Sequence, residues 1–167
     1  MIREDSDNKR EVVVIPDTLS RKIEGNNTNS GVEQKVTTLK QFIQQRSNNF
    51  EYRFVSPSSL TATEKENYEL ITRVCELIGG KPQQVHSIII SETMQKDTIT
   101  FDTCIGLWEN AHNRIIILRE ILKDRKLFLG TLLHELAHAR SGCSDSTRGF
   151  EKELTHMLGI LADLAIK

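Results

Sequence analysis

The chain has 167 residues, 38% hydrophobic and 27% charged, which is enough to form one folded domain with polar tails. Lys and Arg number 22 and Asp and Glu 23, so the net charge of −1 excludes a basic field over the whole chain and makes nucleic acid an unexpected partner. No apolar run approaches the ~20 residues of a membrane span, and the charged start lacks a signal-peptide pattern. Three widely spaced cysteines favour a reducing compartment, so we expect a cytoplasmic protein without a membrane segment.

The N-terminal part of the chain is predicted to be a tail and a linker. Residues 12–15 are a β-branched run that predicts a short strand, and residues 25–31 are small, polar and bounded by glycines. We therefore expect a tail and linker over residues 1–31, as at a junction with an upstream module, and a folded domain over residues 32–167. Apolar residues at helical spacing predict that this domain starts with a helix over residues 32–46.

The middle of the chain predicts a strand, a helix and a second strand. Aromatic residues alternate with charged ones over residues 50–55, as in a half-buried strand. Thr61 and Glu64 have the spacing of a capping box, which predicts a helix that runs from there to the glycines at 79 and 80. Isoleucines dominate residues 85–90, so we expect a buried strand.

The C-terminal part predicts a hairpin followed by helices. Residues 104–108 and 114–118 read as antiparallel strands joined by a polar turn. Residues 127–139 are strongly apolar and helical, and a final helix is expected to open at Asp145. Helix, strands, helix and helix in that order predict an α+β fold.

His134, Glu135 and His138 form the pattern H-E-x-x-H on the predicted helix 127–139. The spacing of four places both imidazoles on one helix face, where they can bind one Zn²⁺ ion. The carboxylate of Glu135 can accept a proton from a zinc-bound water, whose pKa falls to about 7. The competing interpretation is a pair of core histidines that bond to neighbours. We favour the metal site, because two histidines on so apolar a helix need partners.

A zinc site with two histidines needs a third protein ligand. Asp145 is the leading candidate, because a short loop after His138 can return it to the metal, and Glu151 is the next. As a plain alternative, Asp145 is a standard helix N-cap. The remaining downstream candidates are Cys143, Glu153 and His156. Mn²⁺, Fe²⁺ or Ni²⁺ could also occupy a site of two histidines and one carboxylate.

Residues 131–159, TLLHELAHARSGCSDSTRGFEKELTHMLG, resemble the active helix of zincin metallopeptidases and the segment that follows it. They are similar in particular to a zincin-like domain found at the C-terminus of bacterial proteins with an upstream GHKL-type ATPase. The resemblance extends to residues 90–94 and 106–109 and covers roughly residues 50–165. More distant similarity is to SprT, WLM and ImmA/IrrE-type zincins. In the first two the third ligand is typically a histidine, and this chain offers Asp145 instead.

The resemblance implies a minimal zincin-like fold, in which a small mixed sheet packs on the active-site helix and a C-terminal helix follows. It also implies Zn²⁺ as cofactor, a peptide or protein substrate, and an upstream ATPase domain or partner protein. In such a fold residues 115–117 would form a core strand and residues 104–108 an edge strand, where a peptide can add by backbone hydrogen bonds.

Four functions remain open at this point. The first is a zinc-dependent peptidase in which Glu135 is the general base and His134, His138 and Asp145 hold the metal. The second is a catalytically weak, zinc-stabilised interaction or regulatory domain of a larger ATPase-linked system. The other two are a cytoplasmic sensor or toxin-associated protein that cleaves one partner only, and a helical module without zinc. The second interpretation draws on the absence of any tyrosine after Tyr68, since no downstream tyrosine can then stabilise an oxyanion.

Overall fold

The computed structural model describes residues 4–5, 10–11, 50–96 and 102–167, and the chain divides into two compact units, Met1–Asn49 and Phe50–Lys167. In the first unit, strands β1 (Glu4–Asp5) and β2 (Arg10–Glu11) pair antiparallel. The strand, linker and helix predicted between residues 12 and 46 lie outside the described residues. The boundary at residue 31 therefore stays a prediction.

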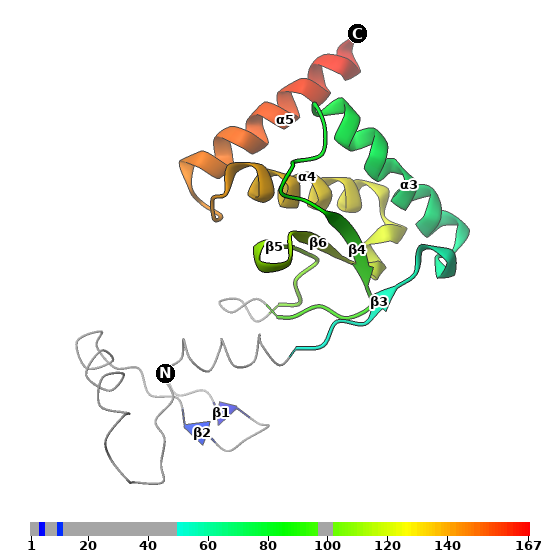
Figure 1. The fold of residues 1–167 in the computed structure, drawn as a ribbon, viewed down its shortest axis with the longest axis vertical. Helices are drawn as coiled ribbons and strands as arrows, with labels where there is room; N and C mark the ends of the chain where they lie inside the picture. The colour runs from blue at the N-terminus through cyan, green and yellow to red at the C-terminus, as the bar shows by residue number, and fades with distance from the viewer. Residues whose placement is uncertain (1–3, 6–9, 12–49, 97–101) are drawn as a thin grey trace, which may run out of the picture. The chain divides into compact units, whose positions relative to one another are not determined.

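The second unit contains a four-stranded mixed sheet in the order β3-β4-β6-β5 (Figure 1). Strand β4 is parallel to β6, whereas β3 and β5 each pair antiparallel with their neighbours. The strands span Phe54–Val55 (β3), Ser87–Ser91 (β4), Gly106–Glu109 (β5) and Arg114–Leu118 (β6). The sheet is small and has β5 at one edge, as expected for residues 104–108 from the resemblance to a zincin-like fold.

Strand β6 is the centre of the sheet. Ile115, Ile116 and Ile117 are each fully buried, so both faces of this strand are covered. They lie in register with the isoleucines of β4, Ile88 opposite Ile115 and Ile90 opposite Ile117. A continuous β-branched run suits a strand that is buried on both faces.

The described residues of this unit include three α-helices, and α4 contacts both of the others (Figure 1). The helices are α3 (Ala62–Leu77), α4 (Arg125–Ser141) and α5 (Arg148–Ile166). Helix α4 also packs on β5 and β6. Its residues Phe128, Leu132 and Leu136 are fully buried at a spacing of four, which forms one continuous apolar row. This arrangement is an α+β fold, as predicted.

Several local predictions are confirmed. Thr61 and Glu64 form the capping box at the start of α3, and each accepts the backbone N–H of the other. Strands β5 and β6 form the antiparallel hairpin, and the turn contains a short 3₁₀ segment, Asn110–His112. The strand expected over residues 50–55 is shorter, because only Phe54–Val55 pairs with β4.

The expected start of the last helix at Asp145 is wrong. Helix α5 begins at Arg148, and its N-cap is Thr147, whose hydroxyl accepts the N–H of Phe150. Ser146 has φ 58°, in the left-handed region, so the chain cannot continue a helix through it. Asp145 therefore lies in the loop that connects α4 to α5, and this loop is what brings it to the histidines.

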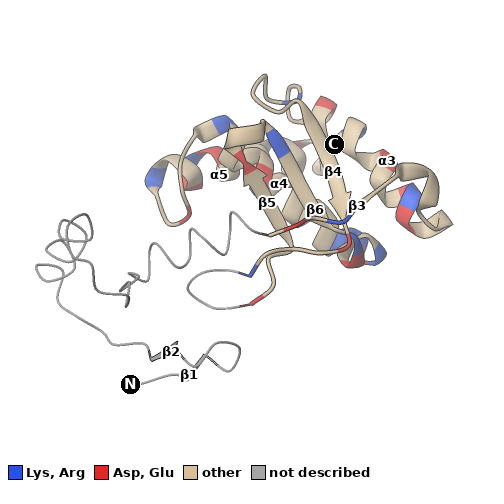
Figure 2. Cartoon of the chain, turned by 60° about the horizontal axis from the view of Figure 1, so that its bottom comes forward, with Lys and Arg blue, Asp and Glu red and all other residues tan. Residues whose placement is uncertain are grey.

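Acidic and basic residues are interspersed over the described elements (Figure 2). This distribution agrees with the near-balanced total of 22 basic and 23 acidic residues. Within the described part of the chain, none of the helices has the length and apolar character needed to cross a bilayer.

Candidate metal centre

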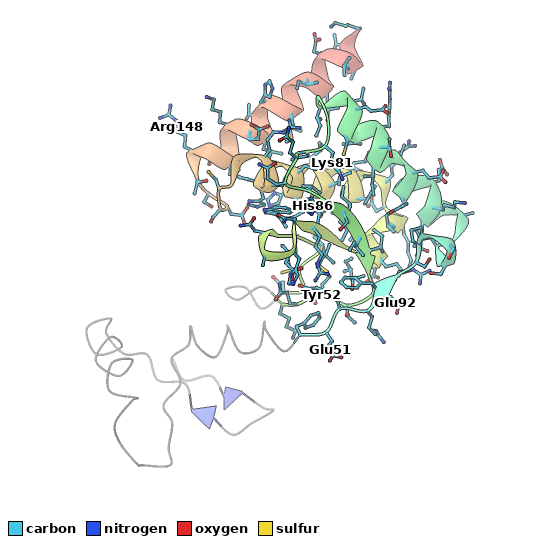
Figure 3. The ribbon with its side chains drawn as sticks, in the orientation of Figure 1. Glu51, Tyr52, Lys81, His86, Glu92 and Arg148 are labelled. Carbon is cyan, nitrogen blue, oxygen red and sulfur yellow. The ribbon has the colours of Figure 1, made fainter. Side chains whose placement is uncertain are left out.

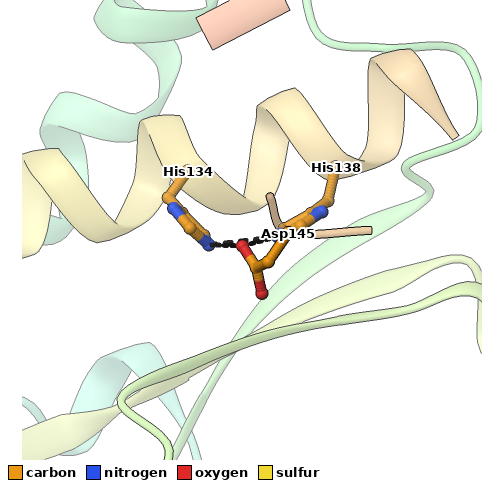
Figure 4. A group of neighbouring side chains, drawn as sticks. All are labelled: His134, His138 and Asp145. Carbon is orange, nitrogen blue, oxygen red and sulfur yellow. Dashed lines mark hydrogen bonds and ion pairs between the residues drawn. The ribbon is translucent and has the colours of Figure 1, made fainter. Parts of the chain in front are cut away.

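Helix α4 presents His134 and His138 on one face, as the spacing predicts. Their Nε2 atoms lie 3.0 Å apart, and the ring centroids are 4.7 Å apart. The neighbouring Leu133 and Ala137 are buried, so the helix is anchored and the imidazoles have little freedom to move. The two nitrogens converge on one point beside the helix (Figure 4).

The loop between α4 and α5 adds a carboxylate to this point. Gly142 ends α4 in the left-handed conformation, φ 65°, and donates its N–H to the carbonyl of His138. The chain then reverses, and Asp145 Oδ1 lies 3.1 Å from Nε2 of His134 and 3.1 Å from Nε2 of His138. The structure thus groups His134, His138 and Asp145, the three residues proposed from the sequence as metal ligands.

The tautomer of His138 follows from its second hydrogen bond. Its Nδ1 lies 2.8 Å from the carbonyl oxygen of Cys143, which can only accept, so Nδ1 carries the proton. In the neutral imidazole, Nε2 then has a lone pair that faces Asp145 and His134. Metal-binding histidines usually have such a carbonyl or carboxylate partner on the far ring nitrogen.

The donor set fits a zinc ion in composition and spacing. Two imidazole nitrogens and one carboxylate oxygen are ordinary zinc ligands, and tetrahedral ligands bound at about 2.0–2.1 Å stand roughly 3.3 Å from one another. The three donors here are separated by 3.0, 3.1 and 3.1 Å. Lone pairs that converge so closely repel each other unless a proton or a cation lies between them, so the three donors could hold a cation.

Exposure differs between the three donors. The side chain of His138 is 14% exposed, that of His134 39% and that of Asp145 68%. One side of the centre is therefore open to solvent, so a metal ion bound there would keep a position for water or substrate. Burial, together with the neighbouring His138, lowers the pKa of His134, which favours the neutral imidazole that a metal ion requires.

Phe150, in the first turn of α5, holds both imidazoles from the side. Its ring stacks on His138 at a centroid distance of 4.3 Å and meets His134 edge to face at 4.8 Å. Phe150 is itself buried in the core. Helix α5 therefore contributes packing to the centre, and the α4–α5 loop contributes the carboxylate.

Glu135 lies on the side of α4 that faces β5. It is 6% exposed, and its Oε2 accepts the backbone N–H of Trp108 at 2.7 Å. Burial is the largest influence on this carboxyl and raises its pKa to about 7, against the opposing effects of His138 and of the Trp108 bond. A carboxyl with such a pKa can accept and return a proton near neutral pH.

Gly106 allows the close approach of β5 to α4. A Cβ atom at this position would lie 2.5 Å from Cγ2 of Thr131 and 2.7 Å from Oε1 of Glu135. Both contacts are shorter than any side chain tolerates. Glycine is therefore required here for the edge strand to reach the motif.

The other candidates lie away from the three donors. Glu151 and His156 are exposed on α5, and Glu153 pairs with Arg140 at 3.4 Å. The thiol of Cys143 lies 3.4 Å from the carbonyl of Ser141, so this residue reaches the centre only through its own carbonyl. Arg148 is exposed and projects outward from the start of α5 (Figure 3).

Four contributors to the site were not predicted: the carbonyl of Cys143, the amide of Trp108, the close approach at Gly106 and the packing of Phe150 on the imidazoles. The first two are backbone groups, which the identity of a residue does not reveal. Gly106 did carry a signal, because a glycine inside an apolar strand often marks the close approach of another segment.

Comparisons with known proteins supply relatives without a described activity. Two proteins of Mycoplasma pneumoniae, each described only as an uncharacterized protein, are similar to this chain. One is 28% identical over 130 residues and the other 30% identical over 126 residues, in each case 74% of this chain. The chain spans 35% of the length of the first relative and 66% of the second. No family model and no solved structure matches the chain.

Proposed function

We propose that this chain is a zinc-dependent metallopeptidase domain of the zincin type that hydrolyses peptide bonds. The observation that carries the proposal is the convergence of His134, His138 and Asp145 on one point beside the helix that bears Glu135. The resemblance of residues 131–159 to zincins supports it. Zinc is the proposed ion, because the donor set of nitrogens and oxygen suits it.

A zinc ion bound there would supply a water molecule with a pKa lowered to about 7. Glu135 is the proposed general base: it would take a proton from that water and later give it to the leaving amine. His134 and His138 would hold the ion from α4, and Asp145 would hold it from the loop. The exposed side of the centre would admit an extended peptide along the edge of β5 that no other described strand occupies.

The test begins with the metal content of protein purified without added metal or a histidine tag. We expect about one zinc per chain in the wild type, loss of zinc in Asp145→Ala, and retention in the matched control Glu151→Ala. Absence of metal from the wild type, with no uptake on addition of Zn²⁺, would contradict the proposal.

The catalytic part is tested with Glu135→Gln and a pool of quenched fluorescent peptides. This variant should keep its zinc, because Glu135 is not among the three donors. Its kcat/KM should fall by about 100-fold or more, as is usual when a general base is removed. A variant that cleaves the pool as fast as the wild type would exclude this role for Glu135.

A second candidate function is a catalytically weak, zinc-stabilised interaction or regulatory domain of a larger, ATPase-linked system. The position of Glu135 favours this second function, because both carboxylate oxygens lie against β5, Oε2 on the Trp108 amide and Oε1 near Gly106. The greater length of one relative is also in keeping with a module of a larger protein. This function predicts zinc-dependent stability without cleavage of any peptide in the pool.

A further inference from the structure

Strand β5 has one edge that no other described strand pairs with, and the direction of its backbone groups can be assigned. The strand is the last in the sheet and pairs with β6 in the register Gly106–Ile117 and Trp108–Ile115. The N–H of Leu118 bonds to the carbonyl of Ile105, which makes that pair a hydrogen-bonded one. Because such pairs alternate along antiparallel strands, Gly106 and Trp108 direct their backbone groups away from β6.

The outward N–H of Trp108 is already used within the domain. It donates to Oε2 of Glu135 at 2.7 Å, and Oε1 of the same carboxylate lies 2.7 Å from the Cβ position of Gly106. Glu135 therefore accepts a hydrogen bond from the edge strand at Trp108 and lies close to Gly106. A peptide that adds to this edge as a further strand would place one of its carbonyl oxygens where it accepts this same N–H. The peptide and Glu135 therefore compete for the Trp108 amide.

We propose that an extended peptide displaces Glu135 from the Trp108 amide, so that strand addition at β5 releases the carboxylate toward the metal centre. The inference rests on the proposed function and adds a coupling: Glu135 is held by the protein at rest and becomes available when substrate binds. The amide of Trp108 is then a positioning group, which acts through Glu135.

Trp108 is the only tryptophan of the chain, so selective ¹⁵N-tryptophan labelling of the full-length protein yields one backbone amide resonance. In the wild type without peptide this amide should exchange slowly with solvent. Glu135→Ala should raise its exchange rate about tenfold or more, because the acceptor is lost, and Glu135→Gln should have a smaller effect, because it retains an amide oxygen. Glu151→Ala, an exposed glutamate of α5, is the matched control and should change nothing.

The probe for the second step is a pool of capped hexapeptides, titrated at low temperature while cleavage is followed by mass spectrometry in the same samples. Glu135→Ala should bind the pool about five- to tenfold more tightly than the wild type, because no internal acceptor competes for the amide. Bound peptide should restore slow exchange of the Trp108 amide in Glu135→Ala.

The proposal would be overturned if the exchange rate of the Trp108 amide were the same in Glu135→Ala as in the wild type. It would also be overturned if this variant bound the peptides no more tightly than the wild type, or if neither form bound them. If Glu135→Ala fails to fold, Glu135→Gln replaces it: this variant should show faster exchange of the Trp108 amide and tighter peptide binding than the wild type, each to a smaller extent, and no change in either would overturn the proposal. Failure of the proposed function has a different signature: the wild type would bind peptide and show the competition, but it would not cleave the pool.

Discussion

Gly149 and Cys143 determine how closely helix α5 approaches the loop that contains Asp145. A Cβ atom on Gly149 would lie 2.5 Å from the sulfur of Cys143. The carbonyl of Cys143 is the partner of His138, so a displaced Cys143 would disturb the orientation of a proposed ligand. At most helical positions, replacing glycine with alanine stabilises the protein by about 1 kcal/mol. The contact with the Cys143 sulfur therefore decides whether Gly149→Ala raises or lowers the free energy of unfolding.

Gly149→Ala is expected to lower the free energy of unfolding by about 1 kcal/mol, because overpacking against the sulfur exceeds the gain in helix propensity. In a Cys143→Ala background the same substitution should stabilise the protein by up to about 1 kcal/mol, because the clash is gone. Urea denaturation of the four forms checks both values. The same sign in both backgrounds would show that this contact does not control the position of α5.

At the level of elements, a partly buried ion pair joins helix α3 to the 3₁₀ segment Arg119–Lys123 that precedes α4. Glu64 is buried, and Arg119 donates Nε to its Oε1 at 3.0 Å and Nη2 to its Oε2 at 2.9 Å. The same carboxylate completes the capping box with Thr61. The hydrogen bonds from Arg119 and Thr61 lower the pKa of Glu64 from 4.5 to about 2.

Glu64→Gln should reduce the free energy of unfolding at pH 7 by about 2 kcal/mol, because a charged and bidentate partner of Arg119 is lost. The pKa of Glu64 is lower in the folded state than in the unfolded state, so its ionised carboxylate stabilises the fold at pH values above the unfolded pKa. This stabilisation is lost as the pH falls through the folded-state pKa. The difference between wild type and variant should therefore shrink from pH 4.5 to about pH 2. Urea titrations across this range measure it.

Glu92→Gln is the control for this pair, because Glu92 also contacts Arg119 but is exposed. It should cost less than about 1 kcal/mol, as is usual for surface pairs. A difference for Glu64→Gln that stayed constant down to pH 2 would show that the ionised carboxylate adds no stability.

For the whole molecule, the centre joins α4 to the loop that leads into α5, so a bound metal should stabilise the fold. At a zinc concentration about 100 times its dissociation constant, the gain is about 2.7 kcal/mol. Removal of zinc from the full chain with a chelator should lower Tm by roughly 10 °C, measured by differential scanning fluorimetry.

Asp145→Ala should lose this response to the chelator, because one donor is missing. His156→Ala should keep it, since His156 is exposed on α5 and is not one of the three grouped donors. If neither zinc nor the chelator changes the Tm of the wild type, a metal does not link α4 to the loop that leads into α5.

Local structure could be predicted where neighbouring residues determine it. Thr61 and Glu64 satisfy each other within one turn, the isoleucines of β6 require burial whatever their partner, and the spacing of His134 and His138 places both on one helix face. The start of the last helix was predicted incorrectly, because Asp145 and Thr147 are both good N-caps and only the left-handed backbone at Ser146 decides between them.

By itself, the sequence determined the α+β class, the helix that carries the H-E-x-x-H pattern and the hairpin before it, because periodicity, caps and turns act over a few residues. Only the tertiary structure decided that Asp145 reaches both imidazoles, that the Cys143 carbonyl orients His138, and that the Trp108 amide holds Glu135. These contacts depend on the path of a loop and on backbone groups that every residue shares. Their positions follow from packing of the whole fold, which residue identity alone does not specify.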